Sequence, residues 1–424
     1  MTPRPYQIPG IEKAVGALPK HGAYLLADET GCGKTFSAAF TAKRLGWPVA
    51  VVCPKAVIPA WRGVLTALNV PTVFIENIER LRSRKEWLRK EGKKWVWNIP
   101  RCLLICDEVH RFGSPDSQSA HILNAAPKPV LMLSATVADS PLKLRAIGSQ
   151  LGLTTWNNWW SWCLKNGCKP AFFGGLEFKN PAKLAALHEA IFTEKGSRVR
   201  KKDLPPGEFP EEQIELVPVP VDEPAKINAE YAELLTALQA ESPNAAVFNL
   251  RARQLSELQK LPAIESMVGD LLEEGNSVCV FLNFSNSLEH LHAKFPDASL
   301  VFGTNTRGQT QNAEDRQAQI ERFQANETNL ILCMTSAGGI GISLHDLHGE
   351  HPRVSLINPN HSAVELIQAL GRIHRNGAKT PCIQRLLFAA DTIEEQVMKK
   401  VQKKVGNISL LSDGDLSPLS TNTP

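Results

Sequence analysis

The stretch that decides the fold is Ala23-Tyr-Leu-Leu-Ala-Asp-Glu-Thr-Gly-Cys-Gly-Lys-Thr-Phe36. Its first five residues are apolar, which is typical of a short buried strand, and a helical pattern begins near Lys34. Residues 28–35 between them have the spacing of a Walker A loop, with Asp28 where the first glycine usually stands. The glycines allow successive backbone N–H groups to surround a phosphate, and the helix N-terminus adds partial positive charge. Lys34 can then reach the β- and γ-phosphates of a nucleotide, while the Thr35 hydroxyl suits a Mg²⁺ ligand position.

A tight strand-to-helix turn with a chance Gly-Lys-Thr would give a similar pattern, so the loop needs support from elsewhere in the chain. That support is Arg101-Cys-Leu-Leu-Ile-Cys-Asp107-Glu108-Val-His110. An apolar run that ends in two carboxylates is typical of a buried parallel strand that delivers acids to its C-terminal edge. Asp107 can hold Mg²⁺, and Glu108 can orient or deprotonate an attacking water. Together the two stretches predict a nucleotide-hydrolysing site.

Composition narrows the class of protein without identifying it. The chain has 424 residues, of which 43% are hydrophobic and 21% charged, as in ordinary globular proteins with two or three domains. Lys and Arg number 47 against 43 Asp and Glu, an excess too small to indicate a polyanionic partner by itself. The nine cysteines are scattered through apolar segments, which favours a reducing compartment over a disulfide framework. No apolar run reaches membrane-spanning length, so we expect a soluble, cytoplasmic protein without membrane contact, a nuclear location being the alternative.

The order of strands and helices predicts an α/β fold with two parallel-sheet lobes in tandem and helical insertions. Strands near 23–27, 49–53, 72–75, 101–106 and 129–133 alternate with helices, which indicates parallel βαβ units in a first lobe, residues 1–140. A second series of strands, near 277–282, 299–302, 329–333, 353–357 and 382–388, predicts a second lobe of the same kind, residues 275–405. The remaining segments are predicted to be a helical insertion in the first lobe (141–204), a Pro-rich linker (205–223), a helical insertion in the second lobe (224–274) and a disordered tail (406–424).

Two basic segments have more than one interpretation. Residues 79–94 read as a basic helix, which is either a solvated face paired with its own glutamates or a nucleic-acid contact. Residues 198–202, Arg-Val-Arg-Lys-Lys, are basic enough to meet a phosphate backbone. The tryptophan cluster at 156–162 is better explained as the small core of the insertion than as a base-stacking surface.

The second lobe has no Walker A loop of its own and instead carries Gln368-Ala-Leu-Gly-Arg372-Ile-His-Arg375. Two arginines three residues apart share one face if this segment is helical. Guanidinium groups that reach a γ-phosphate from an opposing lobe act as arginine fingers. The alternative is a surface helix with salt bridges. The predicted nucleotide site in the first lobe favours the arginine-finger interpretation over this alternative.

The ordered set of motifs resembles the superfamily-two helicases and translocases, and within them the Swi/Snf-like ATPases. The matching segments are Arg4–Gln7 (the Q motif), Asp28–Thr35 (motif I), Val52–Lys55 with Trp61 (motif Ia), Asp107–His110 (motif II), Ser134–Thr136 (motif III), Val280–Phe284 (motif IV), Thr335–Leu344 (motif V) and Gln368–Arg375 (motif VI). The insertion is similar to the corresponding region of the annealing-helicase, HARP-like branch at residues 162–163, 173–175, 184–187 and 198–205. Ser134-Ala-Thr136, Ser343 and Gly371-Arg372 depart from the Swi/Snf pattern and are closer to ordinary helicases.

The resemblance implies two RecA-like lobes, ATP and Mg²⁺ as cofactors, and a specific set of site residues. The nucleotide contacts implied are Arg4, Gln7, Asp28, Thr30, Gly31, Cys32, Gly33, Lys34, Thr35, Gly339 and Gly341, with Thr35 and Asp107 at the metal. The catalytic residues implied are Lys34, Asp107, Glu108, Gln368, Arg372 and Arg375. The nucleic-acid contacts implied are Lys55, Trp61, Ser134, Thr136, Asn283, Thr335 and Ser336.

The expected activity is that of a monomeric, DNA-dependent ATPase that translocates on double-stranded or branched DNA and remodels DNA structures or protein–DNA complexes. The resemblance and the absence of chromatin-reading or nuclease modules fit a minimal viral or bacterial member. One alternative is a strand-separating DNA or RNA helicase, which would need a wedge element. Another is an ATP-switched nucleic-acid clamp, which the intact acid pair and the two arginines disfavour.

Overall fold

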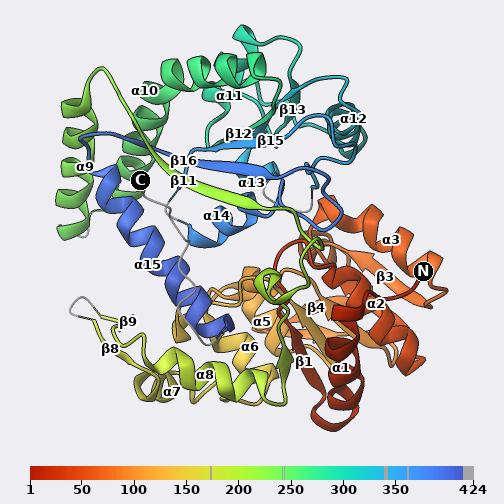
Figure 1. The fold of residues 1–424 in the computed structure, drawn as a ribbon. Helices are drawn as coiled ribbons and strands as arrows, with labels where there is room; N and C mark the ends of the chain where they lie inside the picture. The colour runs from red at the N-terminus through yellow and green to blue at the C-terminus, as the bar shows by residue number, and fades with distance from the viewer. Residues whose placement is uncertain (172–173, 241, 243, 339–341, 361, 414–424) are drawn as a thin grey trace. The chain divides into compact units, whose positions relative to one another are not determined.

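The computed structural model describes residues 1–171, 174–240, 242, 244–338, 342–360 and 362–413. The chain divides into two compact units. Unit 1 comprises Met1–Pro205 together with the described C-terminal residues from Lys404 onward, and unit 2 comprises Pro206–Lys403. Each unit is built on one parallel sheet covered by helices (Figure 1).

Unit 1 holds a six-stranded sheet in the order β10-β1-β7-β6-β2-β3, with every neighbouring pair parallel. The strands are β1 (Ala23–Leu26), β2 (Val49–Val52), β3 (Thr72–Glu76), β6 (Leu103–Cys106), β7 (Val130–Leu133) and β10 (Gly196–Ser197). The α-helices are α1 (Ile8–His21), α2 (Lys34–Leu45), α3 (Ile58–Ala67), α4 (Ile78–Ser83), α5 (Gln118–Asn124), α6 (Arg145–Gln150), α7 (Trp159–Lys165) and α8 (Lys183–Phe192). Side chains of β1 alternate between two apolar clusters, Leu25 in one and Tyr24 and Leu26 in the other. Helices therefore bury both faces of the sheet, which explains why its strands are continuous apolar runs.

Unit 2 repeats this architecture with the strand order β11-β16-β15-β12-β14-β13, again all parallel. The strands are β11 (Glu212–Val219), β12 (Ser277–Leu282), β13 (Ser299–Val301), β14 (Leu330–Met334), β15 (Arg353–Ile357) and β16 (Cys382–Ala389). The helices are α9 (Pro224–Gln239), α10 (Ala245–Glu273), α11 (Ser285–Lys294), α12 (Ala313–Gln324), α13 (Thr335–Gly338), α14 (Ala363–Leu370) and α15 (Glu394–Asp413), whose last residues belong to unit 1. The two parallel sheets confirm the predicted fold class. Helices α9 and α10 lie within residues 224–274, the segment predicted to be a helical insertion.

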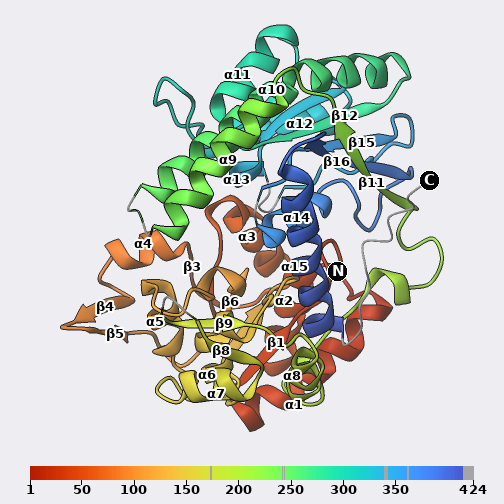
Figure 2. The same cartoon turned by 90° about the vertical axis from the view of Figure 1, so that its left-hand side faces the viewer.

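The basic segment 79–94 is not one helix. Helix α4 ends at Ser83, and an antiparallel hairpin follows, β4 (Leu88–Glu91) and β5 (Lys94–Trp97). Gly92 in its turn has φ +58°, which glycine adopts without strain. Trp95 and Trp97 alternate along β5 and pack against the apolar cluster of unit 1, which anchors the hairpin, while its charged residues are exposed. Figure 2 shows the hairpin extending from unit 1.

The first-lobe insertion and the linker each contain strands that the prediction lacked. Within 141–204, β8 (Cys168–Pro170) and β9 (Leu176–Phe178) form a hairpin, and β10 joins the main sheet beside β1. The proposed linker 205–223 contains β11, the edge strand of the unit 2 sheet, which pairs with β16 along its whole length. Proline is tolerated on an edge strand because one side of it needs no ladder hydrogen bonds, so the Pro-rich composition at Pro218 was misleading.

The prediction of a disordered tail from residue 406 is wrong for residues 406–413. Helix α15 continues to Asp413, and Val405, Ile408 and Leu411, spaced three residues apart, are buried. Their spacing gives the helix an apolar stripe that stabilises it to its end. Residues 414–424 lie outside the described part of the chain.

Candidate nucleotide site

The phosphate loop connects the end of β1 at Leu26 to the start of α2 at Lys34. Gly31 and Gly33 have φ values of +87° and +79°, a region that other residues enter only with strain. A Cβ on Gly33 would also lie 2.6 Å from Gln7 Nε2. Both glycines are therefore required by the path of the loop, and the N-terminus of α2 directs its free N–H groups at the loop.

Gln7 holds the loop from the side of the N-terminal segment. Its Nε2 donates to the carbonyl oxygens of Cys32, at 3.0 Å, and Gly33, at 3.1 Å, and its Oε1 accepts from Arg4 N at 2.9 Å. Gln7 and Cys32 are buried, and burial raises the pKa of the Cys32 thiol to about 12. The structure thus brings together the predicted Q motif and the predicted loop, while Thr30 and Thr35 are half-buried in the same loop.

Lys34 points back into the loop. Its Nζ donates to the carbonyl oxygens of Asp28, at 2.9 Å, and Glu29, at 3.2 Å. Burial lowers the pKa of Lys34, and the nearby negative charges of Glu108 and Asp28 oppose that change. An ammonium held among carbonyl oxygens at the head of a helix is positioned to bind phosphate.

Asp28 has a structural role at the position of the missing glycine. It is buried, with 2% of its surface exposed, and its Oδ1 accepts from Val199 N at 3.0 Å. Burial raises its pKa to about 6, opposed by Lys34, the Val199 hydrogen bond and Arg198. The carboxylate therefore ties the start of the loop to the segment that follows β10.

The acid pair lies just beyond β6, as predicted. Asp107 Oδ2 accepts from Trp61 Nε1 at 2.9 Å, and its Oδ1 accepts from Glu108 N at 2.9 Å. Burial, together with the neighbouring Glu108 charge, raises the pKa of Asp107 to about 6. Glu108 has φ +52°, a strained conformation for this residue type that is characteristic of functional sites. A carboxylate and the hydroxyl of a threonine in the phosphate loop are oxygen donors of the kind that Mg²⁺ binds together with nucleotide phosphates.

Glu108 is linked to the Ser134–Thr136 segment through His110. His110 Nδ1 lies 3.1 Å from Glu108 Oε2 and 3.0 Å from Ser134 Oγ. Ser134 Oγ donates to the Thr136 carbonyl at 2.8 Å. An imidazole between the two segments can orient the Glu108 carboxylate.

Most of the side chains expected to contact nucleic acid are not at the surface. Trp61, Ser134, Thr136 and Thr335 are buried, with exposed fractions of 0%, 0%, 1% and 4%. Trp61 holds Asp107, and Thr335 Oγ1 donates to the Leu282 carbonyl at 3.0 Å. In the described structure the side chains of Trp61, Ser134 and Thr335 are thus engaged in internal hydrogen bonds, and nucleic-acid contacts by these four buried residues stay a prediction. Lys55 and Ser336 are exposed.

The predicted arginine pair of unit 2 is held by the motif V segment. Helix α14 ends at Leu370, so Arg372 and Arg375 lie in the turn after it. Contrary to the prediction, they therefore do not share a helix face. Arg372 donates to the carbonyls of Gln368, at 2.6 Å, and Ile342, at 3.0 Å. Arg375 donates to the Gly371 carbonyl at 3.0 Å and to Ser343 Oγ at 2.5 Å. Gly339 and Gly341 lie outside the described residues.

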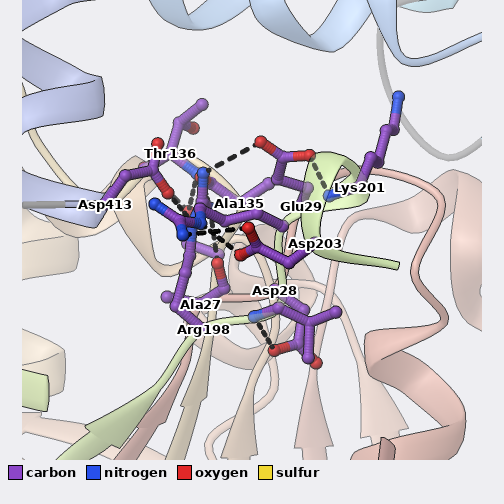
Figure 3. A network of polar contacts seen from close by, with 12 residues as sticks. Ala27, Asp28, Glu29, Ala135, Thr136, Arg198, Lys201, Asp203 and Asp413 are labelled. Atoms are coloured by element: carbon purple, nitrogen blue, oxygen red, sulfur yellow. Dashed lines mark hydrogen bonds and ion pairs between the residues drawn. The ribbon is translucent and has the colours of Figure 1, made fainter. Parts of the chain in front are cut away.

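Two side chains near the site, Glu257 and Arg198, have contacts that sequence reasoning did not predict. Glu257 of α10 is fully buried and accepts from Asn283 N, Asn283 Nδ2 and Phe284 N at 2.9–3.1 Å, which fixes the predicted motif IV residue Asn283. Arg198 was expected to meet a phosphate backbone, but its guanidinium is turned inward toward Ala27, Ala135 and Asp413 (Figure 3). A carboxylate on the apolar stripe of α10 was the available signal for Glu257; no local pattern identifies the partners of Arg198.

Comparison with known proteins identifies the family. A model of the helicase conserved C-terminal domain matches residues 259–377. A putative ATP-dependent RNA helicase of Acanthamoeba polyphaga mimivirus is 32% identical over 456 residues, covering 97% of this chain and 84% of the relative. The chain belongs to the Swi/Snf-like superfamily-two helicases and translocases. It is accordingly an ATP hydrolase of the helicase type.

Two further matches extend over nearly the whole chain. A Caenorhabditis elegans homolog of the SWI/SNF-related matrix-associated actin-dependent regulator of chromatin subfamily A-like protein 1 is 24% identical over 454 residues, which is 96% of this chain and 62% of that relative. The solved SWI2/SNF2 ATPase core of Sulfolobus solfataricus, in complex with double-stranded DNA, aligns over 98% of this chain and 94% of that chain with 17% identity and a TM-score of 0.41. Among the described residues, no helix of this helicase-family protein combines the length and apolarity needed to cross a membrane.

Proposed function

We propose that this protein is a DNA-dependent ATPase that translocates on duplex DNA and remodels DNA structures or protein–DNA complexes. The observation that carries the proposal is the arrangement in unit 1, where Lys34, in a loop shaped by two glycines of positive φ, lies near enough to Asp107 and Glu108 to interact with their charges. Similarity over 96% of this chain, and 62% of the relative, to a SWI/SNF-related regulator of chromatin supports a translocase acting on DNA.

Each residue of the site has a proposed role. The loop N–H groups and Lys34 bind the β- and γ-phosphates of ATP. Gln7 holds the loop from the side on which the adenine base binds. Thr35 and Asp107 would hold Mg²⁺, which would supply positive charge beside the phosphates. Glu108, oriented by His110, accepts the proton of the attacking water.

Unit 2 supplies the groups that complete the site in this proposal. Gln368, Arg372 and Arg375 stabilise negative charge on the γ-phosphate when the lobes close. Hydrolysis then couples to lobe motion, because the arginines act only in the closed arrangement. For nucleic acid, we propose phosphate contacts from Lys55 and Ser336 and from backbone N–H groups of the same motifs, which makes binding independent of sequence.

The test is ATP hydrolysis in the presence of duplex DNA, forked DNA, single strands or double-stranded RNA. We expect low turnover without nucleic acid, the largest stimulation with duplex or forked DNA, and loss of stimulation at high salt because phosphate contacts dominate binding. Glu108→Gln should bind ATP and lower kcat by at least about a hundredfold, whereas Glu12→Gln, an exposed carboxylate of the same unit, should not. Normal turnover in Glu108→Gln would overturn the assignment of the base.

A strand-separating helicase is the second candidate, favoured by the name of the mimivirus relative, a putative RNA helicase. Displacement of a strand from a forked duplex, or stimulation by RNA alone, would select it over the translocase. Displacement of a triplex-forming strand without duplex separation would select the translocase. Consumption of one ATP per protein without further turnover on saturating DNA would indicate a clamp.

A further inference from the structure

Arg198 joins three segments of unit 1 that are remote in sequence (Figure 3). Its Nη1 donates to the carbonyls of Ala27, at 2.5 Å, and Ala135, at 2.8 Å. Its Nη2 lies 3.5 Å from Glu29 Oε1, and its Nε donates to Asp413 Oδ1 at 2.7 Å. One planar cation thus contacts the start of the phosphate loop, the Ser134–Thr136 segment and the last residue of α15.

The Arg198–Asp413 pair is shielded from water. The side chains are 10% and 4% exposed. Removing one member of a buried ion pair leaves the other charge uncompensated, so such a pair holds its geometry strongly. Asp413 is the carboxylate that accepts a hydrogen bond from Arg198, whose other described contacts are two neutral carbonyls, Glu29 at 3.5 Å and the charge of Asp28, so we expect Asp413 to contribute most to its position.

The end of α15 is anchored independently of this pair. Leu411 is fully buried in the apolar cluster of unit 1, and its carbonyl lies 3.0 Å from His188 Nδ1. Ser412 is also buried. Asp413 is therefore delivered to Arg198 by a helix end that is fixed to the same unit.

The pair acts on the part of the loop that holds Lys34. Glu29 N donates to the Val199 carbonyl at 2.9 Å, and Glu29 Oε2 accepts from Lys201 N at 2.8 Å. The Asp28 and Glu29 carbonyls in turn accept from Lys34 Nζ. A displacement of Arg198 therefore moves the carbonyls that set the position of the Lys34 ammonium.

We propose that Asp413 is a positioning residue for the ATP site: by holding Arg198, it fixes the Asp28–Glu29 end of the phosphate loop and the carbonyl of Ala135. The C-terminal turn of α15 is then part of the machinery that binds nucleotide. This role rests on the proposed function, because it requires that Lys34 and the loop bind the phosphates of ATP.

The test is a double-mutant cycle on the steady-state ATPase of the full chain with saturating duplex DNA. Asp413→Asn should raise KM for ATP about tenfold, equivalent to about 1.4 kcal/mol, with a much smaller change in kcat. Asp413→Glu should restore part of the loss. Arg198→Gln should show a similar rise in KM, and adding Asp413→Asn to it should have no further effect, because Asp413 acts only through Arg198. Glu395→Gln, an exposed carboxylate near the start of α15, should match the wild type.

Two results would overturn the positioning role: an unchanged KM in Asp413→Asn, with or without a lowered melting temperature, or full additivity of the two substitutions. If Asp413→Asn fails to fold, the KM values of Asp413→Glu and Arg198→Lys decide in the same way. Loss of turnover in Glu108→Gln together with an unchanged KM in Asp413→Asn rejects only the positioning role. Normal turnover in Glu108→Gln rejects the proposed site itself.

Discussion

Substituting Trp61 by Phe tests whether the indole of α3 sets the metal-binding carboxylate. The ring is fully buried, and Nε1 donates to Asp107 Oδ2 at 2.9 Å. Phe keeps an aromatic ring in the core and removes only the donor and part of the volume. A hydrogen bond to a charged acceptor contributes about 1.5–3 kcal/mol. Because this bond lowers the pKa of Asp107, its loss should raise that pKa further above about 6 and weaken Mg²⁺ binding.

The assay is a titration of Mg²⁺ at fixed ATP and DNA, with turnover as the signal. Loss of about 1.5 kcal/mol corresponds to about a tenfold higher half-saturating Mg²⁺ concentration. Trp159→Phe is the matched control, since that indole is also buried in unit 1 and its Nε1 has no hydrogen-bond partner among the residues that the structure describes. Equal Mg²⁺ dependence in Trp61→Phe, Trp159→Phe and the wild type would refute the reasoning.

The remaining predictions concern stability. The raised pKa of Asp107, about 6 against an ordinary 3.8, means that the folded state favours the protonated carboxyl, so this group makes the wild type lose stability as the pH rises from about 4 to 6. The melting temperature of Asp107→Asn, measured in EDTA, should therefore rise relative to that of the wild type across this pH interval. A difference in melting temperature that stays constant with pH would contradict the pKa shift. Glu257→Gln removes a buried acceptor of several N–H groups and should lower the free energy of unfolding in urea by about 2–4 kcal/mol, with no change expected from Glu273→Gln, an exposed carboxylate of the same helix. Lys260→Met leaves the buried Glu394, 2.8 Å away in the native pair, without its cation and should lower the free energy of unfolding by about 3–5 kcal/mol. Adding Glu394→Gln to Lys260→Met should recover part of that free energy. If the effects of the two substitutions simply add, the two side chains do not interact.

The sequence predicted the sheets well because buried parallel strands carry their signal locally. The predicted bounds 277–282 and 353–357 are those of β12 and β15. Strand β10 has two residues, too few for any periodicity, and β11 is a half-exposed edge strand containing Pro218. The hairpin of β4 and β5 was hidden by its charges, which masked the alternation of Trp95 and Trp97.

In the candidate site too, features carried by a single segment were predicted from the sequence, and contacts between distant segments were not. Spacing along single segments was enough to identify Lys34, Asp107 and Glu108. In the structure the charges of the two acids act on the Lys34 ammonium. The hydrogen bond from Trp61 to Asp107 was not predicted, because a tryptophan after a motif gives no sign that it faces a carboxylate 46 residues away. The contacts of Arg198 span 171 and 215 residues, so only the folded chain could reveal them.

The aspartate in place of the first loop glycine has a consequence for engineering this chain. Phosphate loops with glycine at that position depend on backbone freedom, whereas Asp28 fastens the loop to its neighbour through Val199 N–H. Restoring the consensus glycine would delete that tether and leave the Val199 amide without its acceptor. Asp28→Gly, although nearer to the consensus motif, should consequently bind nucleotide more weakly than the wild type. Consensus-guided redesign of this loop should therefore keep the aspartate at its first position.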